Sequence, residues 1–200
     1  MELKLLSKNE LAALYQNDLC VDFPKSELKP LRAMHRLMDL GRYEPLLISK
    51  DGNAIGYAML WLPSNRKGAL LEYFGVLRGL RNSGLGSEIL QLLFTRYGQL
   101  FGEAEIPNSG ITAVDDLRRR RLAFYQRNGF RITDYECALF GVHFNCLYSG
   151  PLSDDRAVEA LHRSVYADYF SPEHMARYIQ LPLSPGEEIH PAPKWLEEFT

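Results

Sequence analysis

The stretch "LRNSGLGSEIL", residues 80–90, combines glycines and serines with the start of a helical pattern, and could bind an anion. The first four backbone N–H groups of a helix have no intrahelical partner and carry a partial positive charge. Glycines omit the Cβ atoms that would keep a large anion away. The spacing indicates a phosphate or pyrophosphate cradle, although a tight turn that needs glycine dihedrals explains the same residues equally well. The cradle would consist of Arg81, Asn82, Ser83, Gly84, Leu85, Gly86 and Ser87.

Two familiar phosphate-binding patterns do not fit this stretch. A P-loop requires GxxxxGK[ST], and no lysine follows Gly84 or Gly86. A dinucleotide fingerprint requires GxGxxG, and the third glycine is missing. The pattern that does fit is R-x-x-G-x-G, from Arg81 to Gly86, between the apolar run "LEYFGV" and a helical apolar pattern.

The elements around the cradle are predicted to form a mixed α/β fold. Periodicity and end signals predict helices followed by three antiparallel-looking strands, then helix, strand, helix and further strands. We therefore expect a mixed, mostly antiparallel central sheet flanked by helices on both faces. Residues 1–150 would form one domain, and 151–200 a helical extension ending in a Pro-rich, extended tail. The predicted helices are 8–18, one broken near Pro30, 85–97, 115–128, 153–170 and one opening at Ser171; the strands are 43–50, 54–62, 69–76, 102–107, 130–140 and 144–149.

Composition narrows the class of protein. The chain has 200 residues, is 46% hydrophobic and carries a formal net charge of -2, so charge gives no reason to expect a nucleic acid or an anionic membrane as partner. Its three cysteines show no CxxC spacing, and the five histidines form no pair at ligand spacing, so no metal site is predicted. No apolar run approaches the length of a membrane span. These features predict a soluble, cytoplasmic protein.

A second motif lies about forty residues after the first. "AFYQRNGF", residues 123–130, ends a predicted helix before a strand. Together with "LLEYFGVLRGLRNSGLGSEILQLL", it resembles the GCN5-related N-acetyltransferase (GNAT) superfamily, whose acetyl-CoA motif is Q/R-x-x-G-x-G/A after a bulged strand and whose later motif is F-Y-x-x-x-G-F. The resemblance covers roughly residues 42–148. The first motif looks particularly like that of small-amine and polyamine acetyltransferases.

This resemblance implies direct transfer of the acetyl group from acetyl-CoA to an amine. Backbone at Phe74, Gly75 and Val76 would then polarise the thioester carbonyl, while the cradle holds the pyrophosphate. Tyr125 matches the family's general acid, and Glu72 matches a glutamate that serves as base in some polyamine-type members. Core packing for Tyr125, and a solvated strand position for Glu72, are the simpler alternatives. Glu103 and Glu105 are competing carboxylates.

The sequence departs from the family pattern at one place and leaves the acceptor open. Arg118, within the run of four arginines 118–121, stands where the family usually has an asparagine that touches the cofactor. Part of this run could bind CoA phosphates or could form a solvated helix face. A small-molecule amine is the expected acceptor. The alternatives are a protein or peptide acceptor, or an acyl-CoA-binding module without turnover, and residues 151–200 are a candidate dimerisation element.

Overall fold

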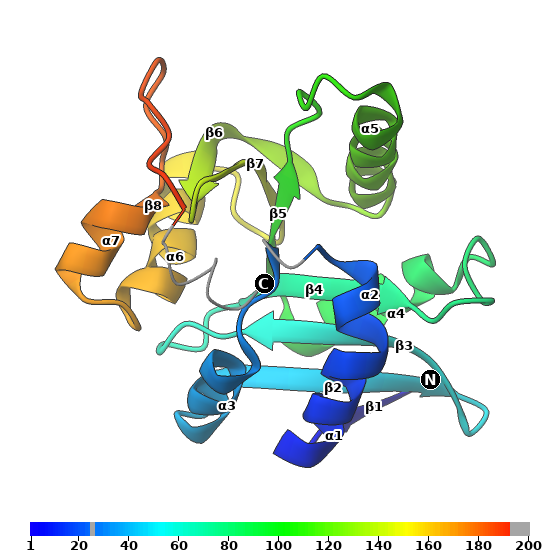
Figure 1. The fold of residues 1–200 in the computed structure, drawn as a ribbon. Coiled ribbons are helices and arrows are strands. Elements are labelled where there is room, and N and C mark those ends of the chain that lie inside the picture. Colours follow the sequence, from blue (N-terminus) through cyan, green and yellow to red (C-terminus); the bar gives the residue numbers. More distant parts are fainter. Residues whose placement is uncertain (25–26, 193–200) are drawn as a thin grey trace. The chain divides into compact units, whose positions relative to one another are not determined.

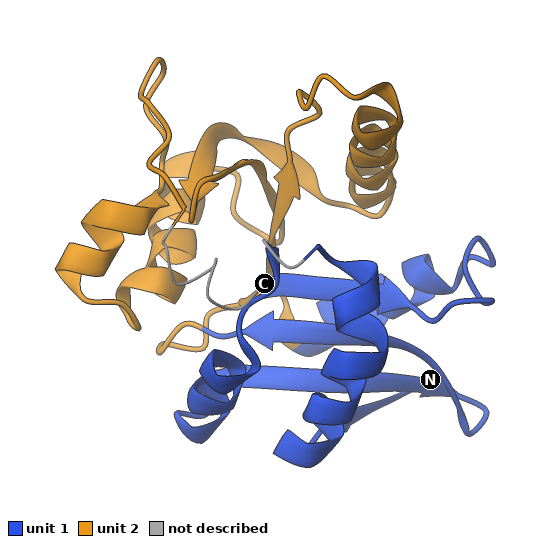
Figure 2. Cartoon of the chain, viewed as in Figure 1, with its two compact units in different colours: residues 1–62, 71–96, 194–200 blue, residues 63–70, 97–193 orange. Residues whose placement is uncertain are grey.

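The computed structural model describes residues 1–24 and 27–192 (Figure 1). The chain forms two compact units, coloured separately in Figure 2. Residues 1–62 and 71–96 belong to unit 1, and residues 63–70 and 97–192 belong to unit 2. The strands follow the order β1-β2-β3-β4-β5-β7-β6-β8. The predicted mixed, mostly antiparallel sheet is thereby confirmed.

Unit 1 contains β1, β2 and β3, which pair in antiparallel fashion, and the part of β4 from Leu71 onward. The first two residues of β4 belong to unit 2. The β2–β3 hairpin turns at Asp51 and Gly52, which both have positive φ as the Asp-Gly-Asn sequence predicts. Helices α1 to α3 lie on one face of these strands, and α4 lies on the other (Figure 1). The elements are β1 (Glu2–Leu5), α1 (Lys8–Leu14), η1 (Tyr15–Leu19), α2 (Cys20–Asp22), α3 (Leu31–Asp39), β2 (Tyr43–Lys50), β3 (Asn53–Trp61), β4 (Ala69–Val76) and α4 (Leu85–Tyr97).

The first helix differs from its prediction as a single helix over 8–18. Ser7 caps α1 through a capping box with Glu10, as the sequence indicates. After Leu14 the helix widens into the π-helical segment η1 and then continues as α2, which ends at Asp22. The four-residue strand β1 is not predicted, because "ELKL" is short and mostly exposed.

Unit 2 is built on β5 (Leu100–Glu105), β6 (Arg131–Leu139), β7 (Val142–Ser149) and β8 (Ile179–Gln180). The first two residues of β4 pair in parallel with β5 through Ala69–Leu100 and Leu70–Phe101. The helices are α5 (Thr112–Arg127), α6 (Asp155–Ala167) and α7 (Pro172–Tyr178). Helix α5 starts three residues before the predicted position. Asp154 caps α6 and Ser171 caps α7, both in agreement with the sequence.

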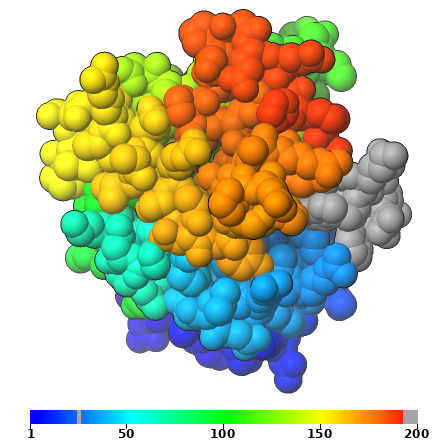
Figure 3. Space-filling model, turned by 90° about the vertical axis from the view of Figure 1, so that its left-hand side faces the viewer, coloured from blue at the N-terminus to red at the C-terminus, as the bar shows by residue number. Residues whose placement is uncertain are grey.

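Hydrogen bonds connect the described part of the C-terminal segment to β6 and to β8. Leu183 donates its N–H to Glu136 O of β6, and the side chain of Gln180 bonds to Glu187 and to the backbone of Glu188 and His190. Residues from α6 to 192, yellow to red, form a continuous surface in Figure 3. The rest of the predicted tail, 193–200, lies outside the described residues. Within the described chain, no helix has the length and apolar character needed to cross a membrane.

Candidate active site

The predicted cradle lies in unit 1 at the junction of β4 and α4. Asn82 (φ 65°), Gly79 (φ 83°) and Gly84 (φ 85°) adopt left-handed backbone conformations. A Cβ atom added at Gly79 or Gly84 would meet nothing within 4 Å. These glycines therefore serve the backbone turn and leave the main chain open, just before the N–H groups at the start of α4. The strand–loop–helix arrangement that the sequence predicts is confirmed.

The side chain of Arg81 is engaged in two hydrogen bonds. Its Nε donates to Val76 O at 3.1 Å, and its Nη2 donates to Asp22 Oδ2 at 2.7 Å. The same carboxylate accepts a hydrogen bond from the Tyr57 hydroxyl at 2.7 Å. It also forms an ion pair with Arg78 Nη2 at 3.2 Å. We call these four residues, Asp22, Tyr57, Arg78 and Arg81, the Asp22 cluster. It ties the loop after β4 to the end of α2, and no sequence pattern predicted it.

We expect Asp22→Asn to lower the free energy of unfolding by about 2 kcal/mol at neutral pH, because hydrogen bonds to a charged group contribute roughly this much. The Asp22 side chain is only 9% exposed. Burial works to raise its pKa, but hydrogen bonds from Arg81, Tyr57 and Arg78 outweigh burial and hold the pKa below its usual value. The stabilisation is therefore present above the ordinary pKa and is lost as the pH falls through the lowered one.

Urea unfolding of the parent and of Asp22→Asn, at neutral pH and at about pH 3, checks this expectation. The difference between them should shrink at acid pH. Asp39→Asn, at the exposed ion pair with Lys8, is the matched control and should change little. An equal difference at both pH values would contradict the role of the Asp22 charge.

Gly75 is required by close packing within unit 1. A Cβ atom there would lie 2.5 Å from the hydroxyl oxygen of Tyr57, inside any allowed contact. On the neighbouring strand, a Cβ on Gly56 would lie 2.7 Å from Gly75 O and 2.9 Å from Ile89 Cδ1. The backbone of β3, the end of β4 and helix α4 thus approach one another closely. Among the two explanations that the sequence allowed for Gly75, the structure supports close packing.

Glu72 is not a solvated strand residue. Its side chain is only 13% exposed, and both carboxylate oxygens are engaged. Tyr43 donates its hydroxyl to Oε2 at 2.5 Å, and Lys29 Nζ lies 2.6 Å from Oε1. Burial and the Glu72 charge raise the pKa of Tyr43 well above its usual value, so the phenol stays protonated as a donor. The carboxylate is fixed in position and paired with an ammonium group.

Tyr125 lies in unit 2 near the end of α5. Its ring packs edge-on against Phe124 and Phe130, with ring centroids 5.5 and 5.3 Å away. Gly129 (φ 88°) turns the chain, so that Phe130 N donates to Tyr125 O. Burial raises the pKa of Tyr125 to about 12. The F-Y-x-x-x-G-F motif therefore describes an aromatic end to a helix, with a phenol that stays protonated at neutral pH.

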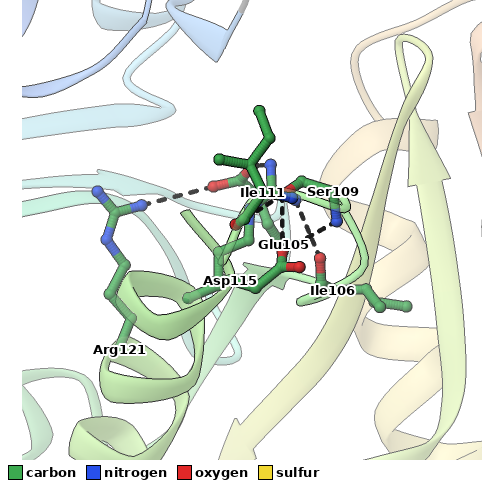
Figure 4. A network of polar contacts seen from close by, with 7 residues as sticks. Glu105, Ile106, Ser109, Ile111, Asp115 and Arg121 are labelled. Carbon is green, nitrogen blue, oxygen red and sulfur yellow. Dashed lines mark hydrogen bonds and ion pairs between the residues drawn. The ribbon is translucent and has the colours of Figure 1, made fainter. Parts of the chain in front are cut away.

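Two of the four consecutive arginines of α5 form ion pairs with Glu105. Arg118 and Arg121, one helical turn apart, both pair with this carboxylate, and Figure 4 shows the Arg121 contact. Arg118 also donates to Ile106 O. These contacts give Arg118 and Arg121 a structural role within unit 2. They also mean that Glu105, one of the competing carboxylates, is held by two cations.

The start of α5 differs from its prediction because of Asp115. Its Oδ1 accepts hydrogen bonds from Ser109 N at 2.9 Å and Ser109 Oγ at 2.8 Å, as Figure 4 shows. Ile111 N in turn donates to Ser109 Oγ. Asp115 thus closes the preceding loop from the first turn of the helix, instead of standing at its beginning.

Glu103, the second competing carboxylate, belongs to a buried network in unit 2. Its Oε1 lies 2.8 Å from His162 Nε2 and accepts the Tyr166 hydroxyl at 2.5 Å. His162 Nδ1 lies 3.2 Å from the Tyr135 hydroxyl. Burial alone would lower the pKa of His162, but Cys146 and Glu103 raise it to about 10. Glu103 therefore has a partner other than a substrate. No set of three His, Cys, Asp or Glu side chains in the described ranges is placed to hold a metal ion.

Comparisons with known proteins agree with this architecture. The model of the acetyltransferase (GNAT) family matches residues 9–130. A GNAT-family protein from Bacteroides thetaiotaomicron superposes with a TM-score of 0.68 at 21% identity, over 84% of this chain and 98% of that one. A spermidine N-acetyltransferase chimera from Vibrio cholerae and hSSAT gives a TM-score of 0.52 at 12% identity, over 74% and 96%. A ribosomal-protein-alanine N-acetyltransferase from Brucella melitensis gives 0.50 at 18%, over 76% and 100%. No curated protein matches the sequence.

The mixed sheet, whose fourth strand runs into an open glycine loop and a helix N-terminus, together with the family match places the chain among the acyl-CoA-dependent transferases. The chain belongs to the GNAT family of acetyltransferases, because the family model covers more than half of it. The loop fits acetyl-CoA as co-substrate, since Gly79 and Gly84 leave the main chain open where a pyrophosphate needs backbone donors.

Proposed function

We propose that this chain transfers the acetyl group of acetyl-CoA to a primary amine of a small molecule. The observation that carries the proposal is Glu72, a largely buried carboxylate on the strand that leads into the glycine loop. An amine with a pKa of about 10 is mostly protonated at neutral pH, so a fixed carboxylate can both attract it and relay its proton through water. The spermidine enzyme among the structural relatives acts on such an amine.

The residues have separate tasks in this proposal. Residues 81–87 hold the pyrophosphate through backbone N–H groups, and Arg81 orders the loop through Val76 and Asp22. Backbone at Phe74, Gly75 and Val76 polarises the thioester carbonyl. Glu72 binds the amine and relays its proton through water when Lys29 has moved away from it, and Tyr125 gives a proton to the departing thiolate. Acetyl-CoA supplies an activated acyl group, whose C–S bond breaks as the C–N bond forms.

The proposal also covers the domain organisation, the oligomeric state and the location of the chain. Residues 1–150 would act as the catalytic domain, and the helices after residue 150 would provide a dimer contact. The chain would work in the cytoplasm. Size-exclusion chromatography with light scattering tests the dimer.

Two measurements together test the proposed function. Acetyl-CoA should raise the thermal midpoint of the chain, and a panel of amines should release free CoA. Stabilisation without turnover of any amine or peptide would favour a binding module. Turnover only with peptide amino termini would favour a protein acceptor. No stabilisation by acetyl-CoA would contradict the proposal as a whole.

Tyr125→Phe is expected to lower kcat by about a hundredfold, because general acid catalysis contributes at least this much. Affinity for acetyl-CoA should stay within a factor of about two, since the ring and its contacts with Phe124 and Phe130 remain. Steady-state kinetics and a thermal titration separate the two effects. Tyr135→Phe, in the buried network of unit 2, is the matched control. An unchanged kcat in Tyr125→Phe would reject the acid role.

A further inference from the structure

Lys29 lies in an enclosure made by three side chains of unit 1. Its Nζ atom is 2.6 Å from Glu72 Oε1, 3.4 Å from the ring centroid of Trp61 and 5.5 Å from that of Tyr43. The Lys29 side chain is 13% exposed, as is that of Glu72. A lysine side chain is a butylammonium ion on a tether. The enclosure therefore already holds a primary alkylammonium.

The walls of this enclosure suit an alkylammonium in general. A carboxylate supplies the charge, and aromatic faces within about 6 Å of an ammonium attract it through their quadrupoles. The walls are also fixed independently of Lys29. Tyr43 donates to the second oxygen of Glu72 at 2.5 Å, and Trp61 is 1% exposed on β3.

The main chain at Lys29 has its own attachment to β4. Lys29 N donates to the Tyr73 hydroxyl at 2.8 Å, and that hydroxyl donates to Glu27 O at 2.8 Å. Phe23 packs edge-on against the Tyr73 ring at 5.0 Å. Shortening the Lys29 side chain would remove the occupant and leave both the walls and the neighbouring chain in place.

We propose that Glu72, Tyr43 and Trp61 form a binding site for a primary alkylammonium, and that Lys29 is its resident occupant. A tethered ligand acts at an effective concentration in the millimolar range, so an external amine must displace Lys29 before it reaches Glu72. Binding at this site needs only the contacts of unit 1. Its consequence for turnover, that Lys29 restricts access of the acceptor, rests on the proposed function.

The test is chemical rescue of Lys29→Ala by n-butylammonium, measured as the thermal midpoint in the absence of acetyl-CoA. The variant leaves the Glu72 carboxylate largely buried and unpaired, so its midpoint should fall below that of the parent. Added n-butylammonium should raise the midpoint in a saturable manner, whereas n-butanol, which has the shape without the charge, should not. Lys8→Ala, at the exposed pair with Asp39, is the control and should show no rescue.

Equal effects of n-butylammonium and n-butanol on Lys29→Ala would overturn the proposal. If the variant does not fold alone, its folded yield on dilution from urea becomes the readout, and no gain from n-butylammonium over n-butanol would overturn it equally. In the double variant Lys29→Ala/Glu72→Gln the rescue should disappear; rescue that persists would show that Glu72 is not the site.

Kinetics separate this inference from the proposed function. In Lys29→Ala the KM for n-butylamine should fall by about tenfold or more, because the competing occupant is gone. Rescue without turnover would support the site and contradict the proposed function. Turnover by the parent chain without rescue of Lys29→Ala would support the function and overturn the site.

Discussion

Glu72→Gln is expected to reduce turnover of an amine by about a hundredfold or more, which is the usual contribution of a positioned general base. The amide keeps the size of the side chain and can still accept the Tyr43 hydroxyl, but it cannot take a proton. It also leaves the Lys29 ammonium without its anion in a site that is 13% exposed. We therefore expect stability to fall by about 3 kcal/mol, at the lower end of the range for breaking a buried ion pair. Steady-state assays of amine turnover measure the first effect, and urea unfolding measures the second.

The double variant Glu72→Gln/Lys29→Met separates stability from catalysis. Removing both charges of a buried pair is close to neutral for stability, so most of the loss should be recovered. Turnover should stay low, because no base is restored. Glu44→Gln, which alters the ion pair with Arg96 elsewhere in unit 1, is the matched control and should change turnover by less than about twofold. A double variant with the turnover of the parent would show that Glu72 is not the base.

Local signals were sufficient to predict the glycine loop between β4 and α4. Glycine conformations, helix end signals and the apolar patterns of β4 and α4 all belong to a continuous stretch of chain. The surroundings of Glu72 were not predictable in this way. Its partners Tyr43 and Lys29 lie 29 and 43 residues away in the sequence. Only packing of the segment around Lys29 against β4 brings the ammonium to the carboxylate.

The partners of the competing carboxylates were not predictable from the sequence either. Glu103, Glu105 and Glu72 look alike as carboxylates on predicted strands. In the structure each has a partner of its own, and that of Glu72 is Lys29. His162 engages Glu103, and arginines of α5 engage Glu105. These neighbours come from helices whose faces cannot be assigned to a particular strand from periodicity alone. Strand β1 was missed for a different reason, since a short exposed edge strand has no apolar alternation.

Gly75→Ala is expected to lower the free energy of unfolding by about 1–3 kcal/mol, the usual cost of inserting an atom into a packed site. The new Cβ would lie 2.5 Å from the Tyr57 hydroxyl oxygen and 2.8 Å from its Cε1. The ring must therefore move. Because Tyr57 also donates to Asp22, which holds Arg81, the displacement should reach the loop after β4 and weaken acetyl-CoA binding by about tenfold.

A matched glycine and a compensating substitution make this expectation specific. Gly102 lies on strand β5, and a Cβ there would meet its nearest neighbour, Leu147 Cβ, at 3.5 Å, so Gly102→Ala should be tolerated. Gly75→Ala/Tyr57→Leu removes the overlap but also the hydrogen bond to Asp22. Stability should recover in part while acetyl-CoA binding stays weak, measured by urea unfolding and calorimetric titration. If Gly75→Ala alone binds acetyl-CoA like the parent, the loop does not depend on the Tyr57–Asp22–Arg81 connection. Close packing would then be the whole reason for glycine at this position.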